Sequence, residues 1–188
     1  MTSTQKLMLV LCALAVTGCA TPARMEQMQI FSSVDPAYRP VLLVAPHLKN
    51  QVFVHDVTGG EETNPMLSSQ VSNEALMEAL EASLRSVGLL GGRTTSDYRL
   101  VAHLEELDQP WIGTDMTVIA TVNYSLEHRK TGRVVLARTV RTSFTAAFSD
   151  ASNAGDRVRL ANEGAVRKNI SAIIKELIEL PPISSTPH

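Results

Sequence analysis

The histidines are the residues of this sequence whose spacing could support acid–base chemistry. His103 lies five residues before Asp108, an H-x4-D spacing that could set a general base beside an orienting carboxylate. On a regular strand, residues five apart face opposite sides of a sheet, so the pair meets only if the chain bends between them. His55 and Asp56 are a second candidate pair, but adjacent strand residues diverge in the same way. The sequence therefore offers two dyads but does not predict an enzyme.

Metal binding and nucleophilic catalysis lack a local signature. A protein metal site needs three or four convergent ligands, which usually show short spacings in the sequence. H-x-x-x-H, H-E-x-x-H, C-x-x-C and G-x-S-x-G patterns do not occur in the chain. A metal site could form only by long-range assembly of the four histidines His47, His55, His103 and His128. We therefore expect no catalytic residue, metal ion or cofactor, apart from the covalent lipid discussed next.

Cys19 has the most specific chemical context in the chain. The apolar run from Leu7 to Val16 follows Lys6 and is too short to span a bilayer, which takes about 20 apolar residues. Its length and positive start fit a secretory signal. The sequence VTGC that ends at Cys19 resembles the lipobox of bacterial lipoproteins. That resemblance implies removal of residues 1–18 and attachment of lipid to Cys19.

The lipobox resemblance also implies a location. A cysteine that carries two or more acyl chains is stably anchored in a membrane. In lipoproteins of two-membrane bacteria, aspartate after the cysteine favours retention in the inner membrane, whereas this chain has Ala20. The resemblance thus implies an outer-membrane lipoprotein that is lipid-anchored on the periplasmic side. Because Cys12 leaves with the signal, the mature chain has one cysteine and no disulfide.

Composition excludes several classes of protein. Hydrophobic residues are 44% and charged residues 19%, as in ordinary globular domains. A formal net charge of −2 lacks the basic excess of a nucleic-acid-binding protein, so we expect no nucleic-acid partner. Residues 19–40 have no sustained periodicity and are predicted to be a tether. Residues 41–180 are predicted to form one periplasmic domain, followed by a tail at 181–188.

Hydrophobic periodicity predicts the elements of this domain. Amphipathic helices are expected at 68–87 and from about 156 to 180, with a loop at 58–69. Strands are expected at 40–48, 51–57, 97–108, 116–126 and 133–148. Each helix must bury one apolar stripe. Both stripes can be buried against the same face of a sheet whose other face meets water. The predicted fold is an α+β two-layer sandwich, a mainly antiparallel sheet with both helices on one face, in the order β-β-α-β-β-β-α.

Alternation within the strands predicts which side chains face the helices. In 116–126 every second residue is apolar or aromatic, and the residues between are polar except Ile119. In 51–57, alternation places Val52, Val54 and Asp56 on one face and Phe53, His55 and Val57 on the other.

The order of elements resembles that of the YajG-like lipoproteins. The stretches that carry the resemblance are LRSVG at the end of the first helix, SDYRLVAHLEEL, a long strand pair and a closing amphipathic helix. More loosely, they resemble auxiliary lipoproteins of ABC-type envelope transport systems. The similarity covers about 41–180 and lies in architecture rather than in signature residues. It implies a binding or accessory protein and supplies no catalytic residue.

The turn predicted at 128–132 carries an excess of positive charge. Five cations and no acidic residue lie between Glu127 and Asp150: Arg129, Lys130, Arg133, Arg138 and Arg141. Solvation of a sheet edge explains such a run most simply. The functional interpretation is contact with anionic head groups or with an acidic partner surface. Arg129, Lys130 and Arg133, the basic hairpin, are the candidate contact residues.

Together these patterns predict a non-catalytic outer-membrane lipoprotein whose periplasm-facing domain binds another cell-envelope component. One alternative is an accessory lipoprotein of an ABC-type system for lipid or lipopolysaccharide transport or assembly. A second alternative is an envelope acyltransferase or hydrolase that uses His103, because the H-x4-D spacing resembles that of glycerolipid acyltransferases. The identity of the envelope partner and the oligomeric state are left open by the sequence.

Overall fold

A four-stranded sheet organises the protein, whose computed structural model describes residues 20–31 and 45–182. The strands lie in the order β1-β2-β3-β4 and are β1 (Val52–Thr58), β2 (Tyr98–Asp108), β3 (Met116–His128) and β4 (Arg133–Ala146). Strands β2, β3 and β4 pair antiparallel. Strand β1 pairs parallel with β2, because helix α4 (Asn73–Ser86) carries the chain back along the sheet between them.

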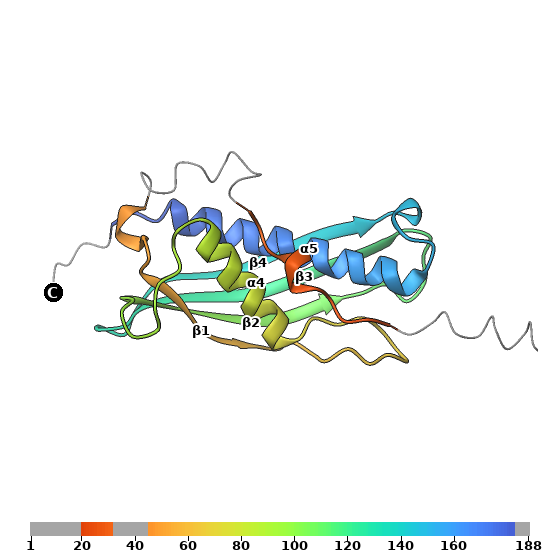
Figure 1. Ribbon diagram of the computed structural model, residues 1–188, viewed down its shortest axis with the longest axis horizontal. Coiled ribbons are helices and arrows are strands. Elements are labelled where there is room, and N and C mark those ends of the chain that lie inside the picture. The colour runs from red at the N-terminus through yellow and green to blue at the C-terminus, as the bar shows by residue number, and fades with distance from the viewer. Residues whose placement is uncertain (1–19, 32–44, 183–188) are drawn as a thin grey trace, which may run out of the picture.

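Both long helices cover the same face of this sheet (Figure 1). Helix α4 packs on β1, and α5 (Ala154–Ile178) packs on β3 and β4. The core between the layers includes fully buried side chains from both helices: Leu76, Leu80, Leu84, Ile170, Ile173 and Leu177. The predicted two-layer α+β sandwich is therefore confirmed.

Local signals explain the limits of α4. The Ser72 hydroxyl accepts a hydrogen bond from the backbone N–H of Ala75 at 3.2 Å and caps the first turn. Gly88 ends the helix with a positive φ of 72°, and the Leu89 N–H donates to the Leu84 carbonyl. The predicted stop at Gly88 is confirmed. The helix starts later than the predicted residue 68, because Gln70 instead accepts a hydrogen bond from Ala23.

A β-bulge changes the faces of β1. The pairing with β2 shifts between Val54 and Asp56, so His55 is an extra residue in the strand. An extra residue reverses the alternation that follows it. Val57 is therefore buried beneath the helices, whereas Asp56 is exposed. The prediction that Asp56 shares a face with Val52 and Val54 is wrong for this reason.

The predicted first strand, 40–48, differs from the structure where it can be compared. Residues 41–44 lie outside the described residues. Pro46–Leu48 is a 3-10 helix, η3, with Leu48 fully buried. Proline lacks the N–H that a strand needs and favours the start of a helical turn, which explains why this part is not a strand.

The N-terminal segment 20–31 packs on the domain instead of forming the start of a free tether. It contains the short helix α2 (Met25–Met28), which contacts both α4 and α5. Met28 is fully buried, and the Ile30 N–H donates to the Ser83 hydroxyl at 3.0 Å. Figure 1 shows this segment lying across the two helices. Within the predicted tether of residues 19–40, the described part 20–31 thus packs on the domain.

Candidate functional site: the two ends of the domain

His103 and Asp108 do not form a dyad. A bulge between Leu104 and Glu106 supplies the bend that the spacing requires and brings both side chains to the helix-free face of the sheet. His103 pairs with Asn123 and Asp108 with Ile119, which are four residues apart on β3. That offset is about 13 Å along a strand, far beyond hydrogen-bond reach. Nδ1 of His103 instead lies 2.9 Å from the Thr58 hydroxyl.

The other histidines have structural surroundings. His55 packs edge-on against Phe53, with ring centroids 5.8 Å apart. His128 contacts the Thr131 hydroxyl through Nδ1 at 2.9 Å. Over residues 20–31 and 45–182, no three His, Cys, Asp or Glu side chains converge as a metal site would require. The four histidines are therefore not brought together.

Buried polar groups between the helices and the sheet are paired with one another. The Tyr124 hydroxyl donates to Oδ1 of Asn169 at 3.0 Å, and Nδ2 of Asn169 donates to the Val140 carbonyl at 2.8 Å. Burial raises the pKa of Tyr124, so its phenol stays protonated at neutral pH. This network fixes α5 on the sheet and does not present a proton donor to a cleft.

Two members of the basic hairpin are engaged in intramolecular contacts. The Arg129 guanidinium donates to the carbonyls of Arg93 and Ser96, both at 2.8 Å, and lies 5.1 Å from the centre of the Phe53 ring. Nζ of Lys130 lies 3.0 Å from a carboxylate oxygen of Asp97. Arg129 thus helps to build the end of the sheet, and Lys130 is partly neutralised.

Arg133 differs from these two. Its side chain has neither an ion pair nor a hydrogen bond within the described part of the chain. Arg133 and the end of the C-terminal helical region line a shallow pocket of about 250 Å³, whose other lining residues are Val134, Val135, Leu180, Pro181 and Pro182. Arg133 is therefore the hairpin residue best placed to meet an external anionic group.

The charge excess on the predicted hairpin is smaller in the fold than in the sequence. Carboxylates from other elements compensate it: Asp97 meets Lys130, and Glu176 of α5 meets Arg138 at 2.7 Å. Glu127, at the end of β3, instead pairs with Arg99 of β2 at 2.8 Å. Counting charges along the chain overlooks partners that the sheet brings in from a distance.

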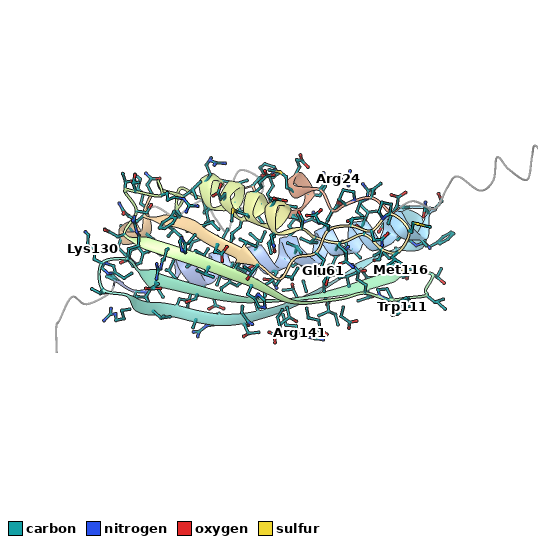
Figure 2. All side chains as sticks on the ribbon, turned by 90° about the horizontal axis from the view of Figure 1, so that it is seen from below. Arg24, Glu61, Trp111, Met116, Lys130 and Arg141 are labelled. Atoms are coloured by element: carbon teal, nitrogen blue, oxygen red, sulfur yellow. The ribbon has the colours of Figure 1, made fainter. Side chains whose placement is uncertain are left out.

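The opposite end of the molecule carries exposed apolar side chains on three loops. Their exposed fractions are 92% for Met66, 78% for Leu67, 97% for Trp111, 93% for Ile112 and 56% for Phe148. We call these five residues the apolar tip. Figure 2 shows Trp111 and Lys130 at opposite ends of the long axis, so the apolar tip and the basic hairpin are far apart.

Hydrogen bonds hold the three loops of the tip together. The Ser68 hydroxyl donates to the Gln109 side chain, and Nε2 of Gln109 donates to the Ser69 carbonyl at 2.7 Å. Between the other loops, the Phe148 N–H donates to Oδ1 of Asp115 at 2.9 Å. Figure 1 shows the β2–β3 and β4–α5 connections at the end where α5 begins. The three loops of the apolar tip are thus joined by hydrogen bonds into one surface.

The first described residue is joined to this end. The Ala20 N–H donates to the Pro65 carbonyl at 2.9 Å, and Ala20 is buried. Cys19, the predicted lipidation site, lies outside the described residues. In the sequence it directly precedes Ala20. The residue that follows the predicted lipidation site is therefore held beside the apolar tip.

Sequence reasoning missed the apolar tip, although a signal for it exists. Asn-Pro-Met-Leu at 64–67 and Gln-Pro-Trp-Ile at 109–112 share an amide residue, a proline and two large apolar residues. A loop is normally polar, so two adjacent large apolar residues after a proline mark an unusual loop. The Gly, Asn and Pro content of 58–69 predicts a loop but does not indicate which side chains the loop exposes.

Comparison with known proteins identifies the fold. No known protein family matches the sequence, and no related sequence was found among curated proteins. The crystal structure of protein XCC0632 from Xanthomonas campestris, of family DUF330, is similar with a TM-score of 0.54 and 15% identity, covering 71% of this chain and 88% of that chain. Hypothetical protein CT253 from Chlamydia trachomatis has a TM-score of 0.52 and 10% identity, covering 69% and 95%. At such identities the similarity extends to the fold alone.

Proposed function

We propose that this protein is a non-catalytic lipoprotein, anchored through lipid on Cys19 to the periplasmic side of the outer membrane, whose domain binds another envelope protein. The observation that carries the proposal is the VTGC sequence after a short apolar run and a positive start. Among the described ranges, no helix is long and apolar enough to span a bilayer.

The described surface supports a binding role. The candidate acid–base pair His103 and Asp108 is separated, and the buried Tyr124 is engaged with Asn169. Arg133 offers a cation without an intramolecular partner in the described residues, beside a shallow pocket. A rim charge of this kind contributes to partner choice and association rate. The partner we propose is accordingly a protein with an acidic contact surface.

The anchor is tested by mass analysis of the protein purified from membranes. We expect a chain that begins at Cys19 with acyl chains attached. Changing Cys19→Ser should leave the chain uncleaved or release it from the membrane, because the serine hydroxyl replaces the thiol that receives the lipid. A mature chain without acyl groups, cut at another position, would refute both the anchor and the proposed location.

A further inference from the structure

We propose that the apolar tip inserts into the interfacial region of the bilayer that holds the lipid anchor, so that the domain stands directly on the membrane. This inference deepens the proposed function and rests on it for the anchor. The ligand is the lipid surface itself, contacted by Met66, Leu67, Trp111, Ile112 and Phe148. Such contact is an interaction of apolar side chains with the boundary between head groups and acyl chains.

The degree of exposure distinguishes these residues from ordinary surface apolar residues. Single exposed apolar side chains are common on soluble proteins, but a group of large ones marks a surface that meets a protein or a membrane. Trp111 and Ile112 are 97% and 93% exposed and follow each other in one loop. Tryptophan is enriched at membrane interfaces, since its ring is amphipathic.

The loops that carry the tip also lack charge where they would meet lipid. Residues 64–69, 109–114 and 146–149 contain no Asp, Glu, Lys or Arg. The carboxylates that follow two of these loops are turned to the backbone: Asp115 accepts from the Phe148 N–H, and Asp150 accepts from the Ala147 N–H at 2.8 Å. Insertion of the loop ends that carry Met66, Leu67, Trp111 and Ile112 would therefore not require a charged group to enter the apolar layer. Phe148 differs, because the Arg157 guanidinium lies 5.0 Å from the centre of its ring. We therefore place Phe148 at the margin of the inserted surface, at the level of the head groups.

The position of the anchor selects a bilayer as the occupant. Ala20 is fixed to Pro65, next to Met66, and only a single peptide bond separates Ala20 from Cys19. An acylated Cys19 therefore brings the membrane surface to the tip, whereas a long free tether would have left the domain unoriented. A second copy of the chain or a protein partner would have to compete with lipid that is covalently held at the same place.

This orientation assigns the two ends of the domain to different partners. Trp111 and Lys130 lie at opposite ends of the long axis (Figure 2), so the basic hairpin points away from the anchoring bilayer. Of the two interpretations of its charge, contact with the head groups of that bilayer is then disfavoured. The hairpin is left to face a protein in the periplasm.

The chain contains a single tryptophan, so its fluorescence reports on Trp111 alone. The mature protein is placed in phosphatidylcholine vesicles with or without brominated acyl chains. We expect Trp111 emission at shorter wavelength than in detergent-free solution of the Cys19→Ser chain, quenching by brominated lipid, and no loss of quenching at high salt. Unquenched emission from vesicle-bound protein would overturn the inference, as would quenching that salt abolishes.

Two variants make the result specific. Val134→Trp in a Trp111→Phe background places the probe near the basic hairpin, where we expect no quenching; equal quenching there would refute the orientation. Met66→Ser with Leu67→Ser should weaken quenching of Trp111. Mass and vesicle flotation report the anchor separately. Acylated, floating protein with unquenched Trp111 overturns the insertion of the tip and keeps the proposed anchor. Protein without acyl groups whose Trp111 is quenched refutes the proposed anchor and keeps the insertion of the tip.

Discussion

Arg24 is the residue that joins the N-terminal segment to the last helix. Its Nε lies 2.9 Å from a carboxylate oxygen of Glu163, and its backbone N–H donates to the same carboxylate at 3.0 Å. Glu163 is 2% exposed, whereas Arg24 is 44% exposed. The hydrogen bonds and the charge of Glu163 raise the pKa of Arg24. Glu163 therefore depends on Arg24 as its counter-charge. Arg24 depends less on Glu163, because water can solvate the guanidinium.

Replacing Arg24 tests this dependence. We expect Arg24→Met to lower the free energy of unfolding by about 2 kcal/mol, since it leaves a buried carboxylate with a lost charged hydrogen bond. Arg24→Met combined with Glu163→Met should recover part of the loss, because neither partner is then left unpaired. Chemical unfolding of the three proteins measures the effect. Equal losses in the single and double variants would show that the ion pair is not what holds the segment.

His47 gives the fold a predicted sensitivity to acid. Neither ring nitrogen has a hydrogen-bond partner among the described residues, and burial lowers the pKa of His47 below its usual 6.5. The unfolded chain then binds a proton on His47 more readily than the folded chain, so stability falls as pH drops below about 6.5. His47→Phe should flatten this part of the dependence of the unfolding midpoint on pH, whereas His55→Phe, at an exposed site, should not. Parallel curves for the parent protein and His47→Phe would contradict the assignment.

Helix α5 lies close to strand β4 of the sheet at Gly164. A Cβ atom at this position would lie 2.3 Å from Cγ of Phe144 on β4, well inside contact distance. The absence of a side chain thus allows the Phe144 ring to lie directly against the helix backbone. This close contact helps to fix α5 over the edge strand of the sheet.

Substitution of Gly164 should reverse the usual effect of alanine in a helix. Gly to Ala in a helix interior ordinarily stabilises by about 1 kcal/mol. Here we expect Gly164→Ala to destabilise by about 1–3 kcal/mol, because the ring must move out of its packed position. Gly155→Ala, in the first turn of α5 where a Cβ meets no closer atom than 3.4 Å, is the matched control. Unchanged or increased thermal stability of Gly164→Ala would show that Phe144 moves at no cost.

The elements that follow a regular period were predictable from the sequence, and those that depend on an irregular residue were not. The alternation of β3 and the stripe of α5 fixed their buried faces, because each element repeats its pattern over many residues. The extra residue at His55 has no local signal, and it moved Asp56 to the exposed face. The packing of 20–31 depends on Glu163, which is 139 residues from Arg24 in sequence.

The candidate site was predictable to a smaller extent. The turn predicted after β3 is confirmed, because turn residues are a local property of the sequence, and Arg133 begins β4 directly after it. The compensation of Lys130 by Asp97 was not, since it requires the end of β3 to lie beside the start of β2. The apolar tip was not predictable for the same reason, because its residues form one surface only when three loops that are distant in sequence meet.

At the scale of the whole molecule, the protein has one cationic end and one apolar end, separated by the length of the sheet (Figure 2). The anchor sequence enters at the apolar end, through Ala20. If the proposed anchor at Cys19 holds the domain at this end, the opposite end faces the periplasm. The basic hairpin, and Arg133 in particular, is therefore where we expect the envelope partner to bind.

Charge reversal at Arg133 tests this expectation. We expect Arg133→Glu to reduce crosslinking to the partner in intact cells by about fivefold, equivalent to about 1 kcal/mol. Arg141→Glu makes the same charge change on the same strand, on the helix-free face of the sheet (Figure 2), and should have little effect. In extracts, high salt should remove the difference between the two variants. Equal crosslinking at low salt would indicate that the hairpin is merely solvated, and an ABC transporter among the products would favour the accessory-subunit alternative.

The contact between Arg24 and Glu163 also sets the order in which parts of the domain can fold. A ribosome makes the N-terminus first, so residues 20–31 exist long before α5, the last helix, is available to them. Until then the segment lacks its contacts with α5, including the ion pair with Glu163, and only those with α4 are available. Closing so long a loop also carries an entropic cost. Final docking of the first residues must therefore be a late event. Nascent chains that end before α5 should show rapid amide exchange in 20–31, and the segment should become protected only when the helix is complete.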